Sequence, residues 1–182
     1  MRKFVPFVAV AVVLAAAPVQ AQACNVATTD AALTSCTVGT SFSMTMPSLM
    51  NLTLSGTSVT LAAPSAVSEF DANGLVQKAT TGPSFTVKSN RSYRVQISAD
   101  AENFSHTAQA GAATYNKPAA DVQWRIGTGS YTDLTTSPTD IGSGSATALS
   151  TAAQVGYNTK FNITKDQPGA YSLGVTFTLI AP

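Results

Sequence analysis

The chain has 182 residues, of which only 10% are charged, and its formal net charge is +1 at pH 7. This length is enough for one domain with a substantial core. The few charges are scattered along the sequence, which excludes a basic patch for nucleic acid and an acidic tail. Solubility must therefore rest on Ser, Thr, Asn and Gln, which also suit strands and turns.

The N-terminus has the three parts of a secretory signal peptide. Arg2 and Lys3 are followed by an uncharged apolar stretch and then by overlapping Ala-x-Ala-like cleavage sites that end at Ala21 and Ala23. The apolar stretch is too short to cross a bilayer comfortably, which takes about 20 residues. We therefore predict that residues 1–23 are removed. The mature protein is then periplasmic, extracellular or on the cell surface, with no membrane span.

Residues 24–40 are a polar N-terminal arm that contains both cysteines, Cys24 and Cys36. Two close cysteines in an exported protein usually pair. A disulfide across so short a loop contributes about 3 kcal/mol in the chain-entropy model, and here it would tether the arm rather than the core. The alternative is that Cys24 is a lipid-modified first residue, although Gln22 fits such a signal poorly.

The rest of the chain, residues 41–182, contains short runs in which apolar and polar residues alternate. Such runs are typical of strands with one buried face. In chain order, these runs cover residues 41–46, 49–54, 58–61, 84–88, 93–98, 121–126, 155–164 and 171–179, with residues 131–134 as a short partner. In the first run, Phe42, Met44 and Met46 are expected to face inward.

Two pairs of runs predict hairpins. Residues 84–88 and 93–98 are joined by a short turn, and residues 155–164 and 171–179 by a turn that contains Pro168 and Gly169. The residues expected to face the core from the first hairpin are Phe85, Val87, Tyr93, Val95 and Ile97. The segments expected to be connections are residues 64–74, with a tight turn at Asn73-Gly74, residues 100–118 and residues 137–145.

No stretch of ten or more residues after the signal peptide has the apolar period of a helix. Short strands with turn signals about every 8–12 residues are instead typical of a sandwich. We therefore predict an all-β protein, with a single immunoglobulin-like β-sandwich of about eight short antiparallel strands in residues 41–182.

The sequence Asp166-Gln167-Pro168-Gly169-Ala170-Tyr171, followed by an alternating run, resembles the start of the penultimate strand in immunoglobulin-like sandwiches. Residues 85–97 resemble secreted bacterial fimbrial and surface-coat modules. The resemblance implies that Tyr171 is a corner tyrosine whose hydroxyl binds back to the turn. It also implies that a final strand is missing, and in chaperone-usher pilins the N-terminal arm of the next subunit supplies that strand.

The arm itself, residues 24–39, makes a poor donor strand because Val26, Leu33 and Val38 do not keep a period of two. The alternative is that the last predicted hairpin closes the sheet and that no strand is missing.

Residues suited to catalysis or metal binding are few. His106 is the only histidine, and it lies in a predicted loop without a nucleophile motif, so an exposed loop histidine fits better than a catalytic one. Glu69, Asp71 and Asn73 resemble a fragment of a calcium loop whose later ligands are missing, so a plain turn fits better. We therefore predict no enzyme activity, no cofactor and no metal.

Four aromatic residues are candidates for stacking on a sugar. Trp124 and Tyr157 share their strand faces with core residues, whereas Tyr115 and Tyr131 lie in predicted loops and are the candidate ligand contacts. We predict an exported bacterial structural or adhesive surface protein, a pilin-like subunit that joins copies of itself or other surface subunits by strand addition. The alternative is a secreted monomer that binds carbohydrate or protein.

Overall fold

The computed structural model describes residues 41–182, and within it Met46–Pro182 forms one compact unit. The predicted signal peptide, the arm and both cysteines lie outside the described residues. The unit contains ten strands and two short 3-10 helices. In chain order they are β1 (Met50–Leu54), η1 (Val67–Glu69), β2 (Leu75–Ser89), β3 (Tyr93–Ala99), β4 (Ser105–Ala108), η2 (Ala119–Asp121), β5 (Val122–Ile126), β6 (Thr132–Asp133), β7 (Thr139–Gly144), β8 (Ala153–Asn162), β9 (Gly169–Ser172) and β10 (Val175–Ile180).

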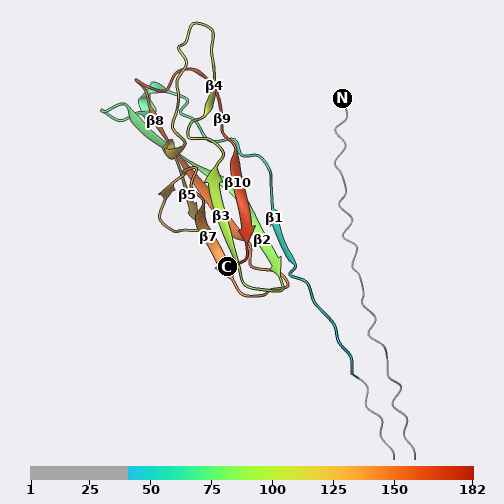
Figure 1. Ribbon diagram of the computed structural model, residues 1–182. Helices are drawn as coiled ribbons and strands as arrows, with labels where there is room; N and C mark the ends of the chain where they lie inside the picture. The colour runs from blue at the N-terminus through green and yellow to red at the C-terminus, as the bar shows by residue number, and fades with distance from the viewer. Residues whose placement is uncertain (1–40) are drawn as a thin grey trace, which may run out of the picture. The chain divides into compact units, whose positions relative to one another are not determined.

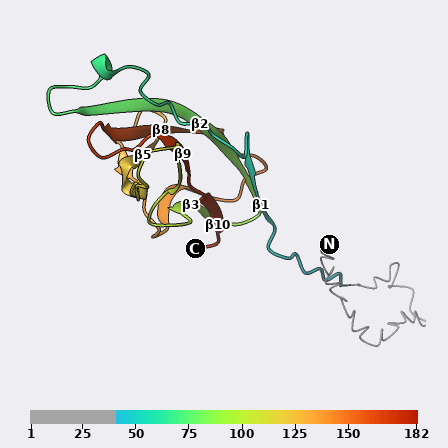
Figure 2. The ribbon, with the colours of Figure 1, turned by 90° about the horizontal axis from the view of Figure 1, so that it is seen from above.

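The strands form two main antiparallel sheets. Five strands pair in the order β1-β2-β8-β5-β6 and three in the order β10-β3-β7, while β4 and β9 form a separate two-stranded ribbon (Figure 1). Figure 2 shows β2 and β8 on one side of the unit and β3 and β10 on the other. The prediction of an all-β fold with antiparallel pairing is confirmed.

The core lies between the two main sheets. Phe85, Val87 and Val155 from the first sheet and Val95 and Ile97 from the second are at most 4% exposed and belong to one buried cluster. Burying each of these side chains stabilises the fold by about 1.5–3 kcal/mol before entropy is counted. The inward direction predicted from the alternation in residues 84–98 is therefore confirmed.

Both predicted hairpins are wrong. β2 pairs with β1 and β8 while β3 pairs with β7 and β10, so the chain crosses from one sheet to the other at residues 90–92. In the same way, β8 lies in the first sheet whereas β9 and β10 pair with β4 and β3. Alternation reports which face of a strand is buried, but it carries no information about the partner strand.

Two predicted strands do not form. Residues 41–46 are in no strand, and Phe42, Met44 and Met46 are 93%, 86% and 66% exposed instead of buried. The alternation is real, but no segment among residues 41–182 pairs with it. Residues 58–61 are in no strand and line a groove described below.

Two predicted connections contain strands. The segment 100–118 includes β4, and the Ser- and Gly-rich segment 137–145 includes β7, whose Ile141 is buried. β2 also begins nine residues earlier than predicted, because a bulge between Thr81 and Ser84 accommodates Gly82 and Pro83 within the strand. Two predicted strands are lost, but β4, β7 and the short partner β6 are added and residues 171–179 divide into β9 and β10, so ten strands replace the predicted eight.

Candidate functional site

The most unusual feature of the unit is an open strand edge beside an apolar groove. β10 lies at the edge of its sheet, and its partly buried Val175, Phe177 and Leu179 pack against the core cluster. Beside it is a groove of about 720 Å³, lined by Val175 and Phe177 on one wall and by residues 56–61 on the other. Figure 1 shows β10 with β3 on one side and β1 on the other.

The backbone of β10 offers free hydrogen-bonding groups along this edge. The amide of Asp100 donates to the carbonyl of Gly174, so the groups of Gly174 and of every second residue after it face β3. In an antiparallel ladder the intervening residues face the other way, which directs the N–H and C=O groups of Val175, Phe177 and Leu179 toward the open edge. The side chains of these three residues pack against the core, and those of Val175 and Phe177 also line the groove.

The opposite wall of the groove is also unpaired. In the part of the chain that the structure describes, residues 56–61 make no backbone–backbone hydrogen bond. The segment is held at its two ends, where the Ser55 amide donates to the Ser84 carbonyl at 2.9 Å and the Ala62 amide donates to the Thr80 hydroxyl at 2.8 Å. Leu54 and Leu61 from this side pack against the core cluster. A strand edge and a facing segment without backbone pairing, with an apolar floor between them, can accept one additional extended strand.

The predicted corner tyrosine lies at one end of this groove. The Tyr171 hydroxyl donates to the Gln167 carbonyl at 2.7 Å and accepts from the Gln167 amide at 3.0 Å. These two hydrogen bonds hold the turn that leads into β9. They also fix the direction in which the chain enters the groove wall. Burial raises the pKa of Tyr171, the Gln167 hydrogen bond lowers it by less, and Asp166 raises it further.

His106 is not an exposed loop residue. It lies in β4 opposite Tyr171, with the two rings stacked 4.2 Å apart, and its Nδ1 accepts the Tyr115 amide at 3.0 Å. Its Nε2 is buried without a hydrogen-bond partner. Among the described residues, no serine or carboxylate forms a hydrogen bond with the ring.

Both candidate ligand tyrosines, Tyr115 and Tyr131, lie outside the strands, as predicted, and both are partly buried. The backbone of Tyr115 is tied to His106, and burial raises the pKa of its hydroxyl, with the carboxylates of Asp166 and Asp121 raising it further. Tyr131 is half-buried, and the Arg125 guanidinium lies 4.5 Å from its ring centroid. Among residues 41–182, no hydrogen bond or ring pair joins the two tyrosines.

The calcium-like residues bind their own turn. Asp71 accepts the amides of Asn73 and Leu75, and Glu69 accepts the amides of Ser65 and Ala66 and forms an ion pair with Lys78. Gly74 has the positive φ of 71° that this turn requires. No cluster of three metal-ligating side chains is found in the part of the chain described.

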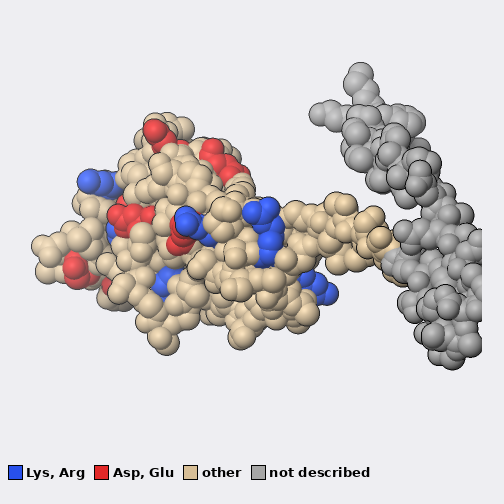
Figure 3. Space-filling model, turned by 60° about the horizontal axis from the view of Figure 1, so that its bottom comes forward, with Lys and Arg blue, Asp and Glu red and all other residues tan. Residues whose placement is uncertain are grey.

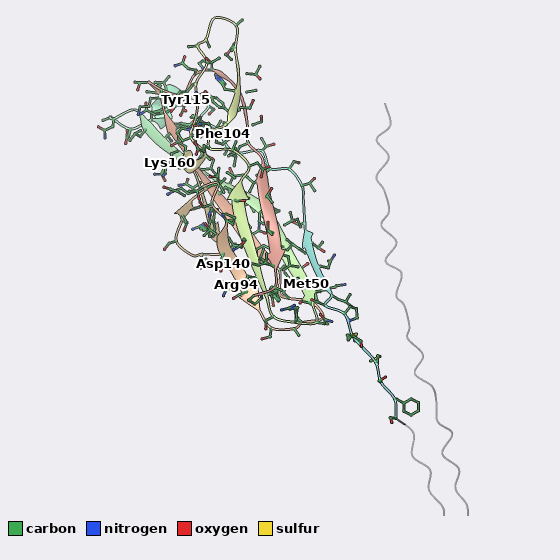
Figure 4. All side chains as sticks on the ribbon, viewed as in Figure 1. Met50, Arg94, Phe104, Tyr115, Asp140 and Lys160 are labelled. Atoms are coloured by element: carbon green, nitrogen blue, oxygen red, sulfur yellow. The ribbon has the colours of Figure 1, made fainter. Side chains whose placement is uncertain are left out.

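Sequence reasoning missed one cluster completely. The side chain of Lys117 is only 2% exposed, and its ammonium binds Asp121, Asp166 and the Lys160 carbonyl. Its sequence context, Asn116-Lys117-Pro118 in a predicted loop, carries no periodic signal. In Figure 4, Tyr115, Phe104 and Lys160 mark this end of the unit, and Met50 marks the other.

Outside the Lys117 cluster, the charged side chains contribute little to the stability of the fold. Figure 3 shows Lys, Arg, Asp and Glu as small separate groups on one face of the described residues. Two of the pairs are largely exposed, Arg94 with Asp140 at 3.3 Å and Lys160 with Asp133 at 2.9 Å. The Lys160 hydrogen bond lowers the pKa of Asp133, but pairs this exposed add little stability.

No family model, curated protein or solved structure matches this chain. Among residues 41–182 there is also no helix with the length and apolar character needed to cross a membrane.

Proposed function

We propose that the protein is an exported structural subunit of a surface assembly, and that copies join by strand addition in the groove beside β10. In this proposal the unit Met46–Pro182 is an immunoglobulin-like sandwich with one strand position open. The observation that carries the proposal is the open edge of β10, where outward-directed backbone groups coincide with the groove-lining side chains of Val175 and Phe177. Unpaired, partly apolar edges are otherwise avoided because they bind other chains.

The chain also carries a segment suited to the groove. In residues 41–46 every second residue is large and apolar, and Phe42, Met44 and Met46 are all strongly exposed. In an extended strand these three side chains share one face and repeat with the same spacing as Val175, Phe177 and Leu179 on β10. We therefore place the donor strand at residues 41–46 of another copy, and not in the arm at residues 24–39.

Three versions of the mature protein test the proposal by sedimentation velocity. The first starts at Cys24, the second at Thr40 and the third at Pro47. We expect the first two to form concentration-dependent oligomers and the third to remain a monomer. A synthetic peptide of residues 40–47 should raise the melting temperature of the third version, and a peptide with Phe42, Met44 and Met46 replaced by serine should not.

Each other outcome has a definite meaning. If all three versions are monomers, the groove does not accept a strand and assembly is abandoned in favour of a monomeric binding module. If only the first version assembles, the donor lies in residues 24–39. If the third version still assembles, the contact uses another surface and the groove has no part in it.

A further inference from the structure

Lys117 and its two acidic neighbours form the most enclosed charged cluster in the described part of the chain. The Lys117 ammonium lies 3.0 and 3.1 Å from the two carboxylate oxygens of Asp166 and 3.1 Å from Oδ2 of Asp121. It also donates to the Lys160 carbonyl at 2.7 Å, and the Phe161 ring centroid is 4.8 Å away. The Asp166 side chain is 13% exposed and that of Asp121 is 31% exposed.

Burial makes this cluster a reactive arrangement as well as an ion pair. One ammonium shared by two carboxylates leaves a net negative charge in a largely buried place, where charged groups are penalised. Condensation of one carboxylate with the amine would remove two of the three charges and release a water molecule. We propose that Lys117 and Asp166 condense to an intramolecular isopeptide bond, with Asp121 as the proton carrier.

The contacts supply a group for each role. Nζ of Lys117 is almost equally distant from both oxygens of Asp166, which places the nucleophile against the carboxyl group and close to its carbon. The Asn162 amide donates to Oδ2 of Asp166 at 2.8 Å, where it stabilises the negative charge that develops during attack. The Lys160 carbonyl orients the amine, and the Phe161 ring shields it from water.

The reaction balances with groups already in the cluster. A proton first passes from the Lys117 ammonium to Asp166, which gives a neutral amine and a neutral carboxylic acid. The nitrogen lone pair then forms the bond to the Asp166 carboxyl carbon. Asp121 accepts a proton from that nitrogen and returns it to the Asp166 hydroxyl, which leaves as water while Asp121 recovers its original charge. No oxidant, reductant or cofactor takes part.

Such a bond would join covalently two segments that lie far apart in the sequence. Lys117 precedes η2, and Asp166 lies in the turn between β8 and β9, 49 positions later in the chain. Lys117 also lines the groove, so the cross-link would fix one end of the groove covalently. This inference does not depend on the proposed function, since it concerns a single folded chain.

Intact-mass spectrometry of the mature protein, unfolded and reduced, tests the proposal. We expect a mass one water molecule below that of the sequence, and proteolysis should release a branched peptide that joins Lys117 to Asp166. Lys117→Arg keeps the positive charge without a nucleophilic amine, and Asp121→Asn keeps the shape without the proton carrier. Both variants should show the full mass, whereas the matched variant Lys160→Arg should lose water as the wild type does.

Two results would overturn the proposal. One is a wild-type protein at its full mass, which decides the question even if the variants fail to fold. The other is a water loss that persists in Lys117→Arg or that yields no branched peptide, because the lost water then comes from another aspartate.

Discussion

The sharpest prediction concerns the double variant Phe42→Ser, Met44→Ser. These side chains are 93% and 86% exposed, so almost all of their apolar surface remains to be buried on assembly. Fully burying one such side chain contributes about 1.5–3 kcal/mol, and the double variant should therefore lose about 3–6 kcal/mol of assembly free energy. At about 1.4 kcal/mol per factor of ten, the concentration of half-assembly should rise by about 100-fold to 10,000-fold.

The assay is sedimentation velocity over a dilution series of the mature protein. The matched control is Val67→Ser, Leu149→Ser, which removes two apolar side chains that are 75% and 59% exposed but lie outside residues 41–46. The control should assemble like the wild type. Both substituted sites of the test variant precede the compact unit Met46–Pro182, so near-ultraviolet circular dichroism and the melting temperature of the monomer should not change.

The reasoning fails if the double variant assembles at the wild-type concentration. It also fails if the control weakens assembly by as much as the double variant does, because general surface hydrophobicity would then account for the association.

Three further predictions address the fold. Ile97→Ala, at a core position that is 1% exposed, should lower the free energy of unfolding by about 2–5 kcal/mol in urea titrations, whereas Ile163→Ala, at a position that is 41% exposed, should change it by less than half as much. Tyr171→Phe removes both hydrogen bonds to Gln167, and the same titrations should show a loss of about 1–3 kcal/mol with no change in the m-value. Burial raises the pKa of Tyr157 to about 12 from an ordinary value of about 10. The unfolded chain therefore loses this proton first, and stability, fully present below pH 10, should fall by about 1.4 kcal/mol per pH unit from pH 10 to 12. Tyr157→Phe should show a shallower decline over that interval, and an unchanged slope would show that Tyr157 is not the group responsible.

The sequence was sufficient to predict the fold class and the buried face of most strands. Val87 and Val95 are completely buried, as their alternation indicates, because the two-residue period of a strand is a local property of the backbone. Strand partners are not local. β2 and β3 are separated by only three residues and still lie in different sheets, since a turn can return the chain onto the same sheet or carry it across to the other.

The candidate site could be predicted only in part. The resemblance in residues 166–171 predicts a missing strand, and the structure contains an open edge at β10. The proposed donor segment, residues 41–46, is predicted from the sequence to be a core strand because Phe42, Met44 and Met46 alternate, and alternation alone cannot distinguish a core strand from an unpaired segment. The Lys117 cluster could not be found, because its contacts join residues 43 and 49 positions apart and depend on the fold.

The positions of the proposed groove and donor also bear on the form of the assembly. The donor segment precedes β1, whereas the groove lies between residues 56–61 and β10, so each copy contributes two different surfaces to a contact. Such heterologous contacts continue from copy to copy unless they close into a ring. A reciprocal exchange of donor segments would instead stop at a dimer. A ladder of regularly spaced oligomers at rising concentration therefore supports serial addition, and a single dimer species at every concentration supports exchange.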